Sequence, residues 1–365
     1  MKRKIYDSFP FDGELDLLEH RLRQNFAETD VFVLVEACET YRGVAKPCSF
    51  RDHSARFEWA AAKLRPVRLS SLGPPDSSPR ERAAVQRNAL MLALHDANDD
   101  DVVLLLDADE IPSRTLLQAL KSSGLAEPHR VEMTRHYQRL NLLAPASTCC
   151  VDRSQPFSCA AAWDAPAGWD AGSKWLSRSG VTVSMRDLRS EGARSPYQWR
   201  FGTVIEARLP KGGRHLTAVD PSAKLSRKMQ RVFHTEWATD RGTYARHIAR
   251  CTDHGVHHRG WWYAEPVPAE LPADLAALAR DYPHMLRKDP LPSFRKRRLV
   301  RTWAWLRQAD WLADRWVRYV DDRFERLLPL ATLPLLALDV GRGFLAALMS
   351  RLGLKRFSPQ QGLPH

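Results

Sequence analysis

The sequence predicts an α/β fold with a mixed central sheet, followed by a basic, mainly helical C-terminal extension. Two continuous apolar runs, residues 31–35 and 102–106, are typical of parallel strands that are buried on both faces. Segments with helical spacing of apolar residues lie between these runs, and such alternation of strands and helices indicates a parallel sheet. The 365 residues are enough for about two domains of average size.

The first third of the chain supplies most of these alternating elements. We expect strands at residues 5–9 and 67–69, and a helix through Leu15 and Phe26 that Asp12 can cap. A second helix is expected to begin after Ser78 and to continue through His95. Its start combines an N-cap serine, a proline at the first helical position and Glu81 in the place that a capping box requires.

The pattern changes near residue 130, where alternation replaces continuous apolar runs. We expect strands at 131–133, 181–183 and, at greater length, 197–209. The pair Gly212-Gly213 predicts a turn before another strand at 215–219. Helices are expected to open at 220–221 and 239–240, and a loop is expected at 153–173.

Charge and cysteine usage narrow the function classes. Lysine and arginine exceed the acids by 55 to 43, a net charge of +12, which favours a polyanionic partner without choosing among nucleic acid, anionic lipid and phosphorylated small molecules. The cysteines form no CxxC pair, and we interpret them as reduced thiols in a cytoplasmic protein. They are Cys38, Cys48, Cys149, Cys150, Cys159 and Cys251. No signal peptide or bilayer-spanning segment is expected.

The strongest local signal for chemistry is the run 102–110, in which a buried strand leads directly into Asp107, Asp109 and Glu110. Open α/β sheets bind ligands at the carboxyl ends of their strands. Two carboxylates there suit Mg²⁺ or Mn²⁺, which can neutralise a nucleotide diphosphate. The alternative is a solvated turn. Arg87, on the preceding helix, can hold a phosphate through two hydrogen bonds, or it is a surface arginine.

The order of these motifs resembles glycosyltransferase family 17, in its bacterial-type members. The resemblance extends over about residues 5–262 and is strongest where Gln86-Arg87-Asn88 precedes Asp107-Ala108-Asp109. It is carried by residues 6–11, 14–22, 32–36, 40–43, 86–88, 106–112, 212–217 and 233–236. The chain departs from the family pattern at Arg214, at Asp220-Pro221 and at Val44-Ala45, which affects the expected acceptor more than the fold.

The resemblance implies a GT-A-like nucleotide-sugar transferase fold and an inverting reaction. The donor would be a UDP-sugar, with N-acetylglucosamine as the expected sugar, and the cofactor Mn²⁺ or Mg²⁺. The resemblance implies two domain halves, residues 1–125 for the nucleotide-sugar and 126–264 for the acceptor. Residues 265–365 are expected to form the basic extension, which the resemblance does not explain. The implied donor-binding residues are Glu36, Arg87, Asn88, Asp107, Gly213 and His215, and the implied metal ligands are Asp107, Asp109 and His234.

An inverting transferase needs one carboxylate that deprotonates the acceptor hydroxyl. With Asp107 and Asp109 assigned to metal, Glu110, Asp220 and Glu236 are the candidates, and Glu236 and Asp220 are the two we predict. Asp220 can equally cap a helix, and Glu236 can equally form a salt bridge with Arg231 or Arg241.

Two other functions compete with the transferase. A phosphohydrolase can use a strand followed by Asp-x-Asp, and a basic protein with an arginine- and tryptophan-rich tail can bind nucleic acid, although we do not expect a nucleic-acid partner. The tail at residues 287–326 carries 12 basic and 6 acidic residues. It suits either a helix packed on the catalytic domain or a peripheral contact with an anionic membrane at its inner face. The acceptor is expected to be a glycan or glycolipid.

Overall fold

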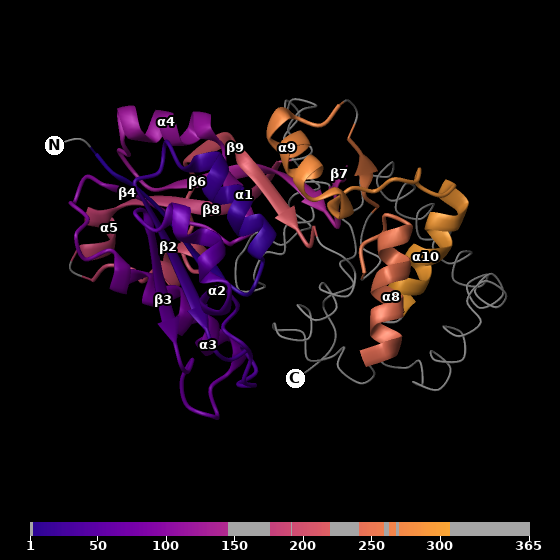
Figure 1. Cartoon of the computed structure of the whole chain (residues 1–365), viewed down its shortest axis with the longest axis horizontal. Helices are drawn as coiled ribbons and strands as arrows, with labels where there is room; N and C mark the ends of the chain where they lie inside the picture. The colour runs from indigo at the N-terminus through magenta and orange to yellow at the C-terminus, as the bar shows by residue number, and fades with distance from the viewer. Residues whose placement is uncertain are drawn as a thin grey trace, which may run out of the picture. The chain divides into compact units, whose positions relative to one another are not determined.

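The computed structural model describes residues 3–144, 176–190, 192–219, 241–258, 263–267 and 270–306. The chain divides into two compact units, residues 1–249 with 262–290 and residues 250–261 with 291–365. The first unit is a mixed α/β structure built on one curled sheet with helices packed against it (Figure 1). The predicted α/β class with a mixed sheet is therefore confirmed, while the predicted domain limits at 125 and 264 stay predictions.

The sheet is parallel over β1 to β4 and mixed over the strands that follow. Its main path runs β10-β7-β6-β8-β4-β1-β2-β3, and β9 pairs in parallel with β6 and antiparallel with β5. The strands are β1 (Ile5–Phe11), β2 (Val31–Ala37), β3 (Leu64–Leu69), β4 (Val102–Leu105), β5 (Glu110–Pro112), β6 (His129–Tyr137), β7 (Arg139–Leu143), β8 (Leu176–Ser184), β9 (Arg208–Thr217) and β10 (Glu265–Pro266). Because β1, β2, β3 and β4 are mutually parallel, their carboxyl ends share one edge.

Helices cover both faces of the parallel strands. Helices α1 and α4 pack on one face, where Phe9, Phe32 and Leu104 are fully buried, and η2, α5 and α6 lie on the face of Tyr6 and Val33. The helices of the first unit are α1 (Leu15–Asn25), α2 (Ser49–Asp52), η1 (Ser54–Ala60), α3 (Pro79–Asn88), η2 (Ala89–Ala93), α4 (Arg114–Ser123), α5 (Met185–Arg189), α6 (Pro196–Phe201), α9 (Ala273–Asp281) and η7 (Pro283–Met285).

Several predicted elements are confirmed, and others need correction. The capping box at Ser78 and Glu81 is present, but α3 ends at Asn88 and continues to Ala93 only as the 3₁₀ helix η2, short of the predicted His95. Asp12 does not cap α1; Glu14 occupies the N-cap position without a side-chain cap, and the Asp12 carboxylate accepts a hydrogen bond from Lys46 instead.

The prediction of a strand over residues 197–209 and a turn at Gly212-Gly213 is wrong. The first part forms helix α6, and both glycines lie inside β9. A Cβ on Gly213 would lie 2.1 Å from the Ile111 carbonyl oxygen, and one on Gly212 would lie 2.3 Å from a Val131 methyl carbon. The glycines are therefore required by the close approach of β9 to β5 and β6. The helix expected at 220–221 and the loop expected at 153–173 lie outside the described residues.

The second unit is represented by the end of α8 (Arg241–Asp253) and by α10 (Phe294–Leu306). The Arg297 guanidinium donates to the backbone carbonyls of His254 at 2.9 Å and Gly255 at 3.2 Å, which ties α10 to the turn after α8. Trp303 is buried, whereas Phe294 is 63% exposed. Within the part of the chain that the structure describes, no helix is long and apolar enough to span a bilayer.

Candidate active site

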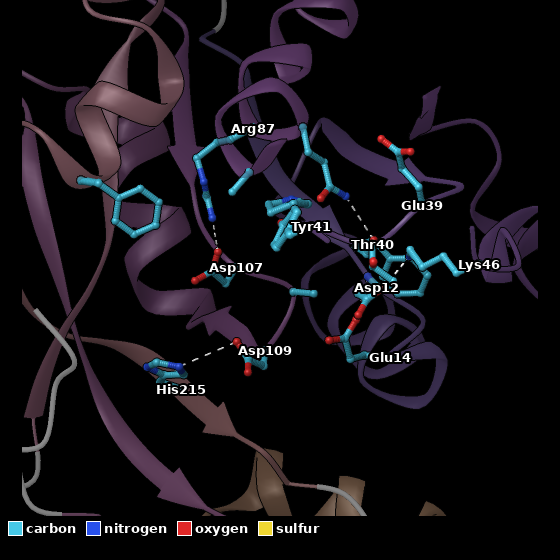
Figure 2. Close-up of a pocket in the computed structure, with 16 residues that line it drawn as sticks. Asp12, Glu14, Glu39, Thr40, Tyr41, Lys46, Arg87, Asp107, Asp109 and His215 are labelled. Carbon is cyan, nitrogen blue, oxygen red and sulfur yellow. Dashed lines mark hydrogen bonds and ion pairs between the residues drawn. The ribbon is translucent and has the colours of Figure 1, made fainter. Parts of the chain in front are cut away.

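A pocket of about 270 Å³ opens at the shared carboxyl edge of the parallel strands (Figure 2). Three strand ends supply its walls: Phe11 ends β1 and Asp12 follows it, residues 39–41 follow β2, and residues 107–109 follow β4. Helices α3 and α6 and strand β9 complete the lining with Arg87, Phe201 and His215. Segments that are far apart in the sequence therefore meet at the edge where open α/β sheets bind ligands.

Asp107 lies between two arginines. Arg87 forms an ion pair with one carboxylate oxygen, and Arg200 donates to the other at 3.1 Å. Burial alone would raise the pKa of Asp107, but these two guanidinium groups hold it well below its usual range. Arg200 also contacts the buried Glu110 at 2.5 Å, and Glu110 accepts a hydrogen bond from the Asp107 backbone N–H at 2.9 Å. Asp107 is therefore ionised and firmly oriented.

A buried ion pair supports the backbone of the loop at residues 107–109, which follows β4. Arg21 of α1 binds Asp7 of β1 through two hydrogen bonds, and both side chains are fully buried. The Arg21 guanidinium also donates to the backbone carbonyls of Asp107 at 2.8 Å and Ala108 at 3.2 Å. This arrangement satisfies backbone carbonyls that would otherwise be left without donors at the strand end. It fixes the loop that presents Asp109.

Asp109 faces His215 across the pocket floor. The His215 Nε2 atom lies 3.7 Å from a carboxylate oxygen of Asp109, and the Nδ1 atom lies 3.8 Å from Glu110 (Figure 2). Burial lowers the pKa of His215, against the opposing effect of Asp109 and Glu110, so the ring is neutral near pH 7. A neutral imidazole next to a carboxylate is a donor pair for a divalent cation.

The opposite wall carries a second set of polar groups. The Lys46 ammonium donates to Asp12 at 2.5 Å, and its side chain is only 6% exposed. Glu39 accepts from Arg82 at 2.7 Å, and Tyr41 belongs to the same wall, on its side toward Arg87 (Figure 2). Burial raises the pKa of the Tyr41 hydroxyl, so it stays protonated.

The structure brings some of the predicted site residues together and places others elsewhere. Arg87, Asp107, Asp109 and His215 line the pocket. Three further predicted donor-binding residues, Glu36, Asn88 and Gly213, are not among its lining residues. The predicted bases Asp220 and Glu236 and the predicted ligand His234 lie outside the described residues.

Two of the residues away from the lining, Glu36 and Asn88, have structural partners. The Glu36 carboxylate accepts hydrogen bonds from the Phe50 backbone N–H at 3.0 and 3.2 Å, at the start of α2. Burial raises the pKa of Glu36, although the backbone donors and Lys46 oppose this. The Asn88 side chain accepts from the Tyr197 backbone N–H at 3.0 Å, which links α3 to α6.

Sequence reasoning missed the wall formed by Asp12, Glu39, Thr40, Tyr41 and Lys46. Asp12 was interpreted as a helix cap, and the segment after β2 was used only for the family resemblance. The available signal was position, because Asp12 directly follows β1 and Glu39, Thr40 and Tyr41 come soon after β2.

The interpretation of all six cysteines as reduced thiols is also wrong. Cys38 and Cys48 form a disulfide at the base of this wall, and Cys251 is buried. Spacing alone did not reveal the pair, because its two members approach each other only when the loop after β2 folds back. Cys149, Cys150 and Cys159 lie outside the described residues.

Comparisons with known proteins agree with the resemblance seen in the sequence. Residues 1–139 match the family model of glycosyltransferase family 17. Two curated relatives, from Homo sapiens and Rattus norvegicus, are named β-1,4-mannosyl-glycoprotein 4-β-N-acetylglucosaminyltransferase. They are 28% and 27% identical over 169 residues, covering 42% of this chain and 31% of theirs. The chain thus spans about a third of the length of these relatives.

A solved structure described as a mycobacterial protein is similar to this one; the alignment covers 64% of this chain and 76% of that chain. Its TM-score is 0.35 and its sequence identity is 14%.

Proposed function

We propose that this chain, whose residues 1–139 match glycosyltransferase family 17, is a glycosyltransferase that moves a sugar from a UDP-sugar to a hydroxyl of a glycan acceptor. The observation that carries the proposal is the pocket at the carboxyl edge of the parallel strands. Arg87, Asp107 and Asp109 in this pocket belong to the region that matches the family model, and His215 comes from β9. The relatives' printed name makes N-acetylglucosamine the proposed sugar. A GT-A-like fold and inversion at the anomeric carbon are part of the proposal.

Arg87 is the proposed contact for the donor's diphosphate. Its guanidinium lies in the pocket wall and already binds an anionic group, the Asp107 carboxylate. The planar guanidinium fork matches phosphate oxygens as well as carboxylate oxygens. Because Asp107 already orients this fork, little side-chain entropy is lost when a diphosphate binds.

The donor groups fit one hard divalent cation. Asp109, with His215 beside it, would hold Mn²⁺ or Mg²⁺, and Asp107 would share in the site, because a carboxylate has about four lone-pair directions and can bind an ion beside its arginine partners. The bound ion would neutralise charge on the leaving diphosphate. Within the described ranges no cluster of three or more His, Cys, Asp or Glu residues forms a complete metal site, and the proposed ligand His234 lies outside them.

The acceptor hydroxyl needs a base that is not engaged by metal. Asp107 and Glu110 are both paired with Arg200, which leaves them poorly suited to accept a proton. Glu236 therefore stays the proposed base, with Asp220 as the alternative.

The acceptor is proposed to be a cell-surface or lipid-linked glycan. The basic start of α10, with exposed Arg295 and Lys296 beside Phe294, supports a peripheral contact with anionic lipid, although Trp303 is buried and does not contribute to it. Flotation with anionic and neutral vesicles tests this contact. The cytoplasmic location stays a prediction, and the Cys38–Cys48 disulfide argues against it, because disulfides persist mainly in oxidising compartments.

A donor screen tests the proposed function. Binding of UDP-N-acetylglucosamine, other UDP-sugars, GDP-sugars and ADP-sugars is measured by calorimetry, with Mn²⁺ or with a chelator. The proposal requires that a UDP-sugar binds and that Mn²⁺ strengthens the binding. Release of free phosphate from sugar phosphates without an acceptor would instead identify a phosphohydrolase. Salt-sensitive nucleic-acid binding without UDP binding would identify a nucleic-acid-binding protein.

A further inference from the structure

One wall of the pocket is a short loop that is closed covalently. The loop leaves β2 at Cys38 and returns at Cys48, directly before α2, and the disulfide joins these two residues. Thr40, Tyr41 and Lys46 project from this loop into the lining of the pocket. The disulfide is therefore attached to the part of the pocket that faces Asp107 and Asp109 (Figure 2).

The loop has little regular structure of its own. A single antiparallel bridge joins Glu39 to Ala45, and a tight turn at Gly43, with φ of +72°, reverses the chain. The Thr40 hydroxyl accepts from the Val44 backbone N–H at 3.2 Å, and the Lys46 backbone N–H donates to the Cys38 carbonyl at 2.9 Å. Such short-range contacts are worth about 1 kcal/mol each. They act together with two ion pairs to residues outside the loop, Glu39 with Arg82 near its start and Lys46 with Asp12 near its end.

Both ends of the disulfide are anchored in the sheet. The Cys38 backbone N–H donates to the Leu69 carbonyl of β3 at 2.9 Å. Cys48 is 2% exposed, and the Glu36 carboxylate of β2 holds the Phe50 backbone N–H two residues further on. The cross-link thus restrains both ends of the loop relative to β2 and β3.

We propose that the Cys38–Cys48 disulfide is a positioning element of the donor pocket, which holds Tyr41 and Lys46 in place for the nucleotide part of the ligand. The inference rests on the proposed function for the identity of that ligand. The disulfide itself does not react with substrate. It acts by limiting the conformations of the loop before the nucleotide binds, so that less conformational entropy is lost on binding.

Reduction of the disulfide provides the test. Dithiothreitol supplies two electrons and two protons and becomes its own cyclic disulfide, and Cys38 and Cys48 become two thiols. Two quantities are then measured on the full chain in both redox states: the dissociation constant for UDP, and amide hydrogen exchange in residues 39–47 compared with β1 and β2. Mass spectrometry of alkylated peptides verifies the redox state of the pair.

We expect reduction to weaken UDP binding about 10-fold and to speed exchange in residues 39–47, while β1 and β2 keep their protection. The double variant Cys38→Ser/Cys48→Ser is the matched control. It retains Cys251 and the other three cysteines, so it must show the weakened affinity without any further response to dithiothreitol.

Three results would overturn the proposal. Unchanged exchange in residues 39–47 would show that the loop needs no cross-link, and faster exchange with unchanged UDP affinity would show that the loop does not position the ligand. Loss of protection in β1 and β2 as well would make the disulfide a support of the whole fold. If the oxidised protein binds no UDP, the proposed function fails, and the exchange of residues 39–47 alone decides whether the disulfide orders the wall.

Discussion

Asp107 and Asp109 are two positions apart, yet the structure gives their carboxylates different partners. Asp107 is held by Arg87 and Arg200, whereas Asp109 faces the imidazole of His215 at 3.7 Å. The first carboxylate therefore orients cationic side chains, and the second is the better placed of the two to hold a cation. Sequence alone treated both as equivalent ligands, because a motif does not reveal which carboxylate its neighbours will neutralise.

The change Asp109→Asn should remove the effect of Mn²⁺ on UDP binding. Loss of one charged ligand weakens the metal site, so the dissociation constant for UDP in Mn²⁺ should rise at least ~10-fold, toward the value in chelator. The melting temperature should change little, because Asp109 lies at a strand end outside the apolar core. Calorimetric titration with and without Mn²⁺ measures the first effect. UDP-Mn²⁺ binding as tight as in the unmodified protein would remove Asp109 from the metal site.

The change Glu236→Gln should lower turnover by ~10²–10⁴ while the affinity for the UDP-sugar barely changes, as expected for loss of a general base. Steady-state kinetics with a glycan acceptor separates the two quantities. Asp220→Asn is the comparison variant. Near-normal turnover for Glu236→Gln with a large loss for Asp220→Asn would move the base to Asp220.

His136 makes stability depend on pH. Burial, reinforced by the charge of Arg214, lowers the pKa of His136 to about 4 in the folded protein, while a histidine in the unfolded chain titrates near 6.5. The folded state therefore binds fewer protons, so the free energy of unfolding is unaffected above pH 6.5 and falls as the pH drops from 6.5 to 4. The full loss is about 3 kcal/mol.

Urea unfolding between pH 4 and 8 measures this dependence. The variant His136→Gln should lose that part of the decline, and His95→Gln, at an exposed position, should keep it. A decline that is equally steep in His136→Gln would contradict the assignment to this histidine.

At the scale of single elements, side-chain caps decide where helices begin. Ser78 accepts a hydrogen bond from the Glu81 backbone N–H at 3.2 Å, and the Glu81 carboxylate accepts one from the Ser78 backbone N–H at 2.7 Å. This start was predicted correctly because the two partners are only three positions apart in the sequence. The end of α3 was not, because the Asn88 side chain binds Tyr197, more than a hundred residues away.

Ser78→Ala should lower the free energy of unfolding by ~1 kcal/mol through loss of the cap. Ser122→Ala is the matched control, because Ser122 lies in the last turn of α4 and does not cap a helix start. Denaturant unfolding measures both variants. Equal stability of Ser78→Ala and the unmodified protein would mean that tertiary packing alone fixes the start of α3.

Helix α6 begins with the same capping signal as α3, yet the sequence pattern predicted a strand there. Ser195, Pro196 and Gln198 repeat the arrangement that opens α3, and the capping box forms as it does there. The aromatic residues that follow favoured a strand by propensity. The prediction of a turn at Gly212-Gly213 failed for a different reason. These glycines are required by close contact of β9 with neighbouring strands, and the sequence does not show which strands will be neighbours.

At the scale of the whole molecule, the pocket combines β1, β2, β4, α3, α6 and β9. The parallel strands and their carboxyl edge followed from the apolar runs, and Asp107, Asp109 and Arg87 followed from their positions next to those runs. The opposite wall did not, because it depends on the fold of the loop after β2 and on the Cys38–Cys48 disulfide. Local patterns thus predict the strands, while the part of the site made by loop closure requires the structure.

We propose that this edge of the sheet is the donor site of a glycosyltransferase, and the rate at which UDP is released from UDP-N-acetylglucosamine in Mn²⁺ decides whether that holds. The rate is compared among the unmodified protein, Asp109→Asn and Asp289→Asn, which makes the same chemical change at an exposed position away from the pocket. We predict release by the unmodified protein and by Asp289→Asn, with a loss of at least ~10² in Asp109→Asn. Equal rates in all three proteins, or no release of UDP under any condition, would contradict the claim.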